Sequence, residues 1–292
     1  MRPRRLIPLT IAMVLASALL ARADTLTLVS ETVWREPGKW FGGFSGLETS
    51  ADGQTADLVT DRATLVRIRL TREAGRIVAI TTLRHTPITY LDGTPAKGDA
   101  ADVEGLAITD DGAAYVSFEH DHRVGRLNLD TGAAGRLPDH PDFAGFPDNG
   151  GLEALAVHTD GRVFAVPESR GGRNGGYPVY VFDGREWNIG TVIPGRGPFR
   201  PVGADFGPDG LLYLLERAVT PLGFRSRIRR FDPAAENLAE VTLLTSAPGR
   251  FDNLESISLW QDADGKTRIT AISDDNFFPI QRTQIVEFML TE

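Results

Sequence analysis

The sequence predicts an all-β fold, a β-propeller of four-stranded antiparallel blades whose ring is closed by the N-terminal strand. Three observations lead to this prediction. After residue 24 short runs of alternating apolar and polar residues take the place of helical periodicity, one segment plan recurs about every 50 residues, and its last copy is one strand short. Short alternating runs broken by Gly, Pro, Asp and Asn are typical of strands and tight turns, and this repeat length is typical of propeller blades.

Residues 1–23 are predicted to be a signal peptide outside the fold. A basic start with three arginines precedes an apolar run at residues 6–20, and "ARA" at residues 21–23 is a small-x-small cleavage site. The apolar run is too short for a typical membrane span. We expect Sec export to the periplasm or the medium, with cleavage near Ala23 and Asp24 and no membrane span in the mature chain. The Arg4-Arg5 pair leaves twin-arginine export as the alternative route.

The repeat begins with a half-buried strand that runs into an Asp-Gly turn. Five segments follow this plan: "SGLETSADG", "EGLAITDDG", "EALAVHTDG", "VGADFGPDG" and "ESISLWQDADG". Their turn glycines are Gly53, Gly112, Gly161, Gly210 and Gly265, spaced by 59, 49, 49 and 55 residues. Asp-Gly suits such turns because their backbone needs positive φ. Further strands follow each turn, so we count five blades, and the insertion at residues 84–103 leaves a sixth as an alternative.

The N-terminal strand is expected to complete the last blade. The fifth copy ends after its third strand, whereas residues 25–33 form a strand that belongs to no copy. Pairing the two removes the exposed edge that a terminal blade would otherwise present. The mature chain, residues 24–292, is therefore predicted to be one domain.

Composition restricts the class of partner. The chain has no cysteine, so an exported protein of this kind must be stable through its core alone, which suits a bacterial periplasm. Without the four arginines of residues 1–23, 27 basic residues stand against 39 acidic ones, a net charge of about −12. This balance argues against nucleic acid and anionic lipid and favours cations. The partner is then a small-molecule substrate or a periplasmic protein, and the oligomeric state is not indicated.

Three glutamates take the same place in the repeat, two residues before the inward apolar residue (Leu106, Leu155 or Ile257) of the strand that leads to the Asp-Gly turn. They are Glu104, Glu153 and Glu255, and the other two copies have Ser45 and Val202 there. The first strand of a propeller blade lines the central channel, so we expect the three carboxylates to converge on its axis.

An acid also stands where each second strand ends, and these acids are expected at the channel mouth. They occur in Asp61-Arg62, Glu119, Glu168-Ser169-Arg170, Glu216-Arg217 and Asp274-Asp275-Asn276. Carboxylates packed together need a counter-charge or a proton. A bound Ca²⁺, which takes six to eight oxygen ligands, would supply the charge. Pairing with nearby arginines, including Arg282, and protonation of some acids are the alternatives.

Several stretches resemble the phytase-like domain family, often labelled "esterase-like activity of phytase family protein". "DNLESI" at residues 252–257 and "ISDDNFFPIQRTQIVEFML" at residues 272–290 resemble its closing signature. "DVEGLAI", "SFEHDHRV", "NGGLEALAV", "VPES" and "LLYLLER" resemble its earlier blades in the same order, so the likeness covers roughly residues 41–290. The resemblance implies a secreted β-propeller with a cation-lined channel.

Two hypotheses of function follow. The first is a metal-dependent hydrolase of a phosphoester, a carboxylic ester or a lactone. Its predicted catalytic residues are Glu104, Glu153, Glu255, Arg62, Arg170 and Arg217, and its predicted calcium ligands are Glu104, Glu153, Glu255, Asp274, Asp275, Asn276 and Asn253. The second is a periplasmic propeller that binds a ligand or a protein without catalysis, in which any calcium is structural.

Overall fold

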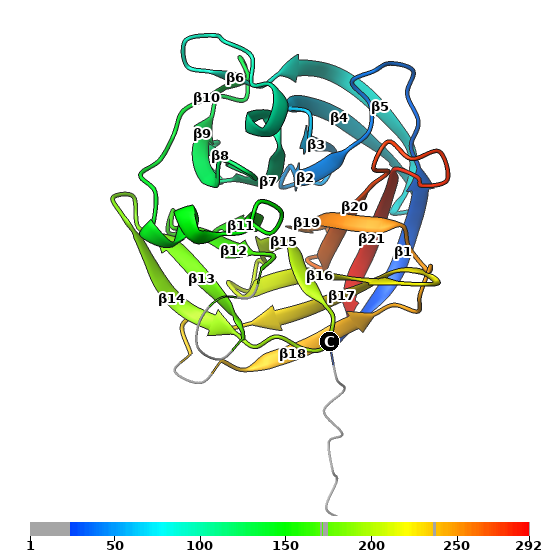
Figure 1. The fold of residues 1–292 in the computed structure, drawn as a ribbon. Coiled ribbons are helices and arrows are strands. Elements are labelled where there is room, and N and C mark those ends of the chain that lie inside the picture. Colours follow the sequence, from blue (N-terminus) through cyan, green and yellow to red (C-terminus); the bar gives the residue numbers. More distant parts are fainter. Residues whose placement is uncertain (1–23, 170, 172–174, 236–237, 292) are drawn as a thin grey trace, which may run out of the picture.

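Five sheets, each with four antiparallel strands, surround a central axis in the computed structural model, which describes residues 24–291 except 170, 172–174 and 236–237 (Figure 1). The predicted signal peptide lies outside the described residues. Blade I comprises β2 (Phe44–Thr49), β3 (Thr55–Thr60), β4 (Thr64–Glu73) and β5 (Arg76–Pro87). Blade III comprises β11 (Leu152–Val157), β12 (Val163–Pro167), β13 (Tyr177–Phe182) and β14 (Trp187–Ile193). Blade IV comprises β15 (Arg200–Phe206), β16 (Leu212–Thr220), β17 (Gly223–Phe231) and β18 (Glu240–Thr245).

Blade V closes the ring as predicted. It comprises β19 (Asn253–Gln261), β20 (Thr267–Asp274), β21 (Gln284–Thr291) and the N-terminal strand β1 (Thr25–Val33). Strand β1 pairs antiparallel with β21 over its whole length, with one bulge between Leu28 and Ser30. The first and last strands of the domain therefore share one sheet, which covers the edge that β21 would otherwise expose.

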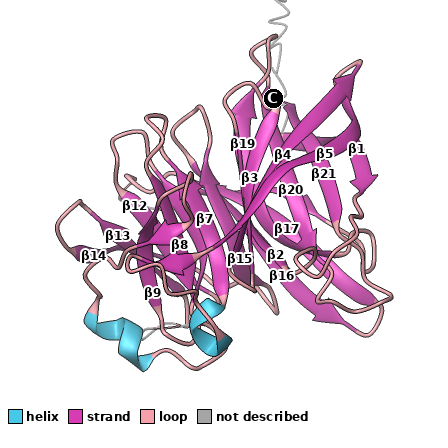
Figure 2. Cartoon of the chain, turned by 90° about the horizontal axis from the view of Figure 1, so that it is seen from above, coloured by secondary structure: helices cyan, strands magenta, loops and turns pink. Residues whose placement is uncertain are grey.

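The insertion at residues 84–103 is not a sixth blade. Blade II comprises β7 (Val103–Ile108), β8 (Ala114–Phe118), β9 (Arg123–Leu127) and the short β10 (Ala133–Ala134). From the insertion, β6 (Thr89–Tyr90) adds a parallel strand beside β10, and a 3₁₀ turn, η1 (Gly98–Ala101), leads into β7. A second 3₁₀ turn, η2 (Pro141–Gly145), precedes blade III, and both turns lie at the same end of the propeller (Figure 2).

The Asp-Gly turns have the conformation that the sequence predicts. The glycines at positions 53, 112, 161, 210 and 265 have φ of +66°, +87°, +88°, +74° and +75°. Positive φ is strained for residues with a side chain, so glycine allows each first strand to return at once as the second.

The hydrophobic core is divided among the blade interfaces. Each of five buried clusters joins two neighbouring blades: one contains Val59 and Leu65 of blade I with Val103 and Leu106 of blade II. The inner strands β2, β7, β11, β15 and β19 contact one another in that order around the ring. This order places residues of distant repeats side by side at the axis. Among the described residues no helix is long and apolar enough to cross a membrane.

Candidate metal and substrate site at the channel mouth

A β-bulge interrupts every inner strand at the position where the sequence alignment placed the three glutamates. The pairing register skips one residue in each blade, and the skipped residues are Ser45, Glu104, Glu153, Val202 and Glu255. A bulge turns the extra side chain out of the regular ladder and is common beside active sites. The residue after the bulge is small in every blade, and in blade II it is glycine because a Cβ on Gly105 would lie 2.8 Å from the Glu153 carbonyl oxygen.

The second strands supply a further ring of side chains. In each blade the residue before the bulge pairs with a residue of the second strand, and the next residue along that second strand belongs to the ring. The pairs are Phe44↔Thr60, Val103↔Phe118, Leu152↔Pro167, Pro201↔Glu216 and Leu254↔Ser273. The equivalent next residues are Asp61, Glu119, Glu168, Arg217 and Asp274. Blade IV therefore differs from the prediction, because it brings an arginine and not an acid to the mouth.

Glu216 is turned away from the channel. It is fully buried between β16 and β17, where its carboxylate accepts hydrogen bonds from Arg227 Nε at 2.6 Å and from Arg229 Nε at 2.8 Å. Successive side chains of a strand face opposite sides of the sheet, so the register that buries Glu216 directs Arg217 to the mouth. The prediction of an acid in every blade is wrong for this reason.

A third layer consists of the residues two positions before each bulge. In blades I, II and III their carbonyl oxygens accept hydrogen bonds from the backbone N–H groups of Asp61, Glu119 and Glu168 at 2.8–2.9 Å. The layer contains Gly43, Asp102, Gly151, Arg200 and Asn253. The sequence prediction included Asn253 but missed Asp102 and Arg200, although the same two-residue offset from Glu104 and Val202 would have found them.

The centre of the site is a group of three carboxylates from blades II and III. One oxygen each of Glu104, Glu119 and Glu153 lies within 4.8 Å of the others. Burial, followed by Glu153, Asp102 and Glu119, raises the pKa of Glu104 well above its usual range. Burial and then Glu255 likewise raise the pKa of Glu153, although Arg217 opposes this. The sequence prediction of convergence for Glu104 and Glu153 agrees with this geometry.

Arg217 joins Glu255 to Glu168. Its Nη1 donates to Glu255 Oε1 and, at 3.0 Å, to Asn253 Oδ1, and its Nη2 donates to Glu168 Oε1 at 3.0 Å. Arg200 Nη1 donates to the other oxygen of Glu168 at 3.1 Å. Burial opposes the charge of Arg217, but the carboxylates around it raise its pKa, so it stays a cation. This side of the mouth can accept an anionic oxygen.

Asp61 and Asp274 form the side of the mouth made by blades I and V. Burial, followed by Asp274 and Asp102, raises the pKa of Asp61 to about 8. Burial raises the pKa of Asp274 to about 6 and that of Glu255 to about 7. Asp61 Oδ1 and Glu255 Oε2 are buried and have no hydrogen-bond partner among the described residues.

The remaining predicted residues lie around this mouth, except one that is outside the described residues. Asp275 holds the 275–283 loop: its Oδ1 accepts from the N–H groups of Gly43 and Phe277, and its Oδ2 accepts from Thr283 Oγ1 at 3.2 Å. Asn276 is exposed with φ +47°, and the exposed Arg62 stacks on Phe277, its Cζ 3.2 Å from the ring centre. Arg170 lies outside the described residues.

This donor set fits a hard divalent cation. All the groups are oxygens, two buried oxygens lack partners, and the carboxylates outnumber the arginines beside them. Calcium prefers carboxylate and amide oxygens and binds six to eight of them. Glu104, Glu119 and Glu153 are the residues best placed to hold it, and Glu119 was missed in the predicted ligand set although it ends a second strand like Asp274.

The metal-free protein is expected to lose stability as the pH rises. Asp274, Glu255 and Asp61 hold their protons up to about pH 6, 7 and 8 in the folded state, whereas unfolded acids release them near pH 4. Their contribution to the free energy of unfolding is therefore complete below about pH 4 and is lost as the pH rises through the pKa values of the folded state. In EDTA the unfolding midpoint should fall by about 5 °C or more from pH 5 to 8.

Calcium should remove most of this pH dependence, because a bound cation stabilises the ionised acids. The measurement is a series of thermal melts at constant ionic strength, with EDTA and with calcium. A midpoint that rises with pH in EDTA, or a slope that calcium leaves unchanged, would contradict the expectation.

A family model described as "Phytase-like: Esterase-like activity of phytase" matches residues 39–277. No curated protein matches the sequence. Similar solved structures include a virginiamycin B lyase from Staphylococcus aureus, 16% identical over 86% of this chain and 71% of that one, with a TM-score of 0.42. They also include an aldose sugar dehydrogenase from Streptomyces coelicolor, 13% identical over 92% and 98%, with a TM-score of 0.48. At these identities neither likeness bears on activity.

Proposed function

The chain belongs to the phytase-like family, and from this premise we propose that it is a calcium-dependent hydrolase acting at the mouth of the propeller channel. Its substrate is a phosphoester, a carboxylic ester or a lactone. The observation that carries the proposal is the group formed by Glu104, Glu119 and Glu153, whose oxygens lie within 4.8 Å of one another beside the cation Arg217. Buried acids without a neutralising partner are typical of functional sites.

Each side of the mouth has a separate role in this proposal. Glu104, Glu119 and Glu153 hold the ion, and bound calcium would polarise the scissile carbonyl or phosphoryl oxygen. Arg217 and Arg200, already oriented by Glu168, donate to an anionic oxygen of the substrate.

Asp61 is the carboxylate best suited to move a proton. Its Oδ1 is buried without a partner among the described residues, and burial raises the pKa of Asp61 to about 8 in the metal-free protein, from which bound calcium would lower it towards neutral pH. A general base works best when its pKa is near the working pH, so Asp61 would accept the proton of an attacking water.

An open pocket of about 610 Å³ beside the mouth can receive the rest of the substrate. It shares Glu168 and Arg200 with the site, and Glu168 also pairs with Arg217. The lining residues are Pro147, Asn149, Glu168, Ser169, Tyr177, Pro198 and Arg200.

We also propose that the protein works after export, since an acidic site of this kind needs the calcium that is available outside the cytoplasm.

The test is a substrate panel on chelator-treated protein whose fold is verified by circular dichroism. p-Nitrophenyl phosphate, p-nitrophenyl acetate and simple lactones are assayed with EDTA and with added calcium. We expect turnover of at least one class that calcium restores and EDTA abolishes. If calcium raises the melting temperature and no substrate is turned over, the ion is structural and the hydrolase proposal is wrong.

A further inference from the structure

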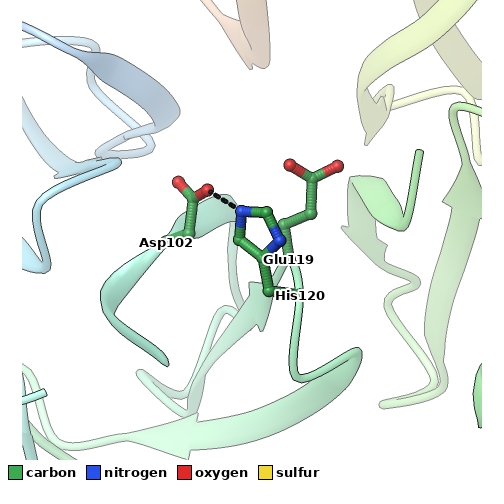
Figure 3. Close-up of side chains that lie close together, drawn as sticks. All are labelled: Asp102, Glu119 and His120. Atoms are coloured by element: carbon green, nitrogen blue, oxygen red, sulfur yellow. Dashed lines mark ion pairs between the residues drawn. The ribbon is translucent and has the colours of Figure 1, made fainter. Parts of the chain in front are cut away.

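A histidine stands beside the acidic group and belongs to none of the roles assigned above. His120 follows Glu119 directly, and its φ of +57° reverses the chain after β8. Its ring lies between the carboxylates of Asp102 and Glu119 (Figure 3). His120 Nε2 is 3.2 Å from Asp102 Oδ2, and one ligand atom from each of the three residues lies within 4.8 Å of the other two.

Glu119 has a carboxylate oxygen available for a ligand. The residue is only 7% exposed, and its Oε1 accepts hydrogen bonds from the N–H groups of Gly150 at 2.6 Å and Gly151 at 3.4 Å. In the described part of the chain no donor reaches its Oε2, and no lysine or arginine forms an ion pair with Glu119 or Asp102. The second oxygen of Glu119 can therefore accept a ligand that enters from the mouth.

The donor set differs from that of the calcium site. It adds an imidazole nitrogen to two carboxylates, and nitrogen ligands favour first-row transition ions such as Zn²⁺ and Mn²⁺ over calcium. The side chains of His120 and Asp102 are 29% and 24% exposed, so an ion can enter from the mouth.

We propose that Asp102, Glu119 and His120 bind a divalent transition ion, and that Glu119 is shared between this ion and the calcium held with Glu104 and Glu153. The shared carboxylate joins the two sites into one two-metal centre, a type that holds both the attacking and the leaving oxygen of a hydrolysed bond. Binding of the transition ion does not depend on the proposed hydrolysis; only its use in the reaction does.

The experiment measures metal binding directly. Metal-free wild-type protein is titrated by calorimetry with Zn²⁺ or Mn²⁺, with and without calcium, and Co²⁺ is added separately to record the visible absorption of a site with a nitrogen ligand. We expect one equivalent of transition ion in addition to calcium. His120→Ala should weaken the transition ion about 100-fold or more, abolish the cobalt bands and leave calcium affinity unchanged.

A matched control is His158→Ala. His158 also pairs with an aspartate, Asp160, at 3.0 Å and is 23% exposed, but it lies at an Asp-Gly turn, at the opposite end of the inner strand from the bulge. The His158→Ala variant should bind both ions like the wild type, whereas Glu119→Gln should weaken the binding of both ions. Wild-type protein without a transition-ion equivalent, or His120→Ala with wild-type affinity, overturns the proposal. Absence of turnover with both ions bound overturns only the proposed hydrolysis.

Discussion

Replacing Glu104 with Gln should weaken calcium binding about 100-fold or more and, at the same time, stabilise the metal-free protein. Glu104 is one of the three acids that share a site, and after burial the charges of Glu153, Asp102, Glu119 and Glu255 raise its pKa. The change removes a ligand, so calcium-dependent turnover should fall by a similar factor. It also removes repulsion among buried carboxylates, which should add about 1 kcal/mol, or 2–4 °C in midpoint, at pH 8 in EDTA.

Glu186→Gln is the matched control for this prediction. Glu186 lies on the exposed β13–β14 turn, where loss of one charge should change neither calcium affinity nor the melting temperature in EDTA by a measurable amount. The measurements are calorimetric titration and thermal melts of both variants. Should Glu104→Gln melt below the wild type in EDTA, the acids would not be repelling one another, and the argument for a compensating cation would fail.

Replacing Glu216 with Gln should destabilise the protein by about 3–5 kcal/mol. The carboxylate is completely buried and is the shared partner of Arg227 and of Arg229, which is itself completely buried. The amide keeps the shape but removes the charge, so two guanidinium groups would stay buried with less compensation. Urea denaturation followed by near-ultraviolet circular dichroism measures the loss.

Glu240→Gln provides the comparison within the same cluster. Glu240 also pairs with Arg229, but its side chain is 25% exposed, so its loss should cost no more than about 1 kcal/mol. Calcium affinity should be unchanged in both variants, because Glu216 faces away from the channel. Equal stability losses in the two variants would show that burial of the Glu216 pair contributes nothing.

The two predictions give opposite changes in the stability of the metal-free protein for the same type of substitution, Glu to Gln. Glu104 and Glu216 are both acids near the end of a strand, and both become glutamine. At Glu216 the change removes the negative charge that pairs with two arginines. At Glu104 it removes one of several carboxylates that repel one another. The difference comes from what surrounds each carboxylate and not from the residue type, which is why the sequence alone expected both acids to face the channel.

Part of the site follows from the repeat itself. Alignment of the repeats placed Glu104, Glu153 and Glu255 together, and these are the bulged residues of three inner strands. The prediction succeeds because each of these glutamates stands two residues before the inward apolar residue of its inner strand, although the turn glycine follows Glu255 after ten residues and follows Glu104 and Glu153 after eight. The role of Glu119 could not be predicted from its own repeat, because Glu119 belongs to blade II and the oxygen of Glu153 that lies near it belongs to blade III.

The sequence by itself determined the architecture: alternation and turn glycines are local signals, and they specified a propeller of at least five blades, its inner strands and the closing role of residues 25–33. Only the tertiary structure decided which charges meet. It directed Arg217 to the mouth and Glu216 into the blade, and it placed His120 beside Asp102. The physical reason is that register and ring packing set the distances between side chains of different strands and blades, and electrostatic energies depend on those distances.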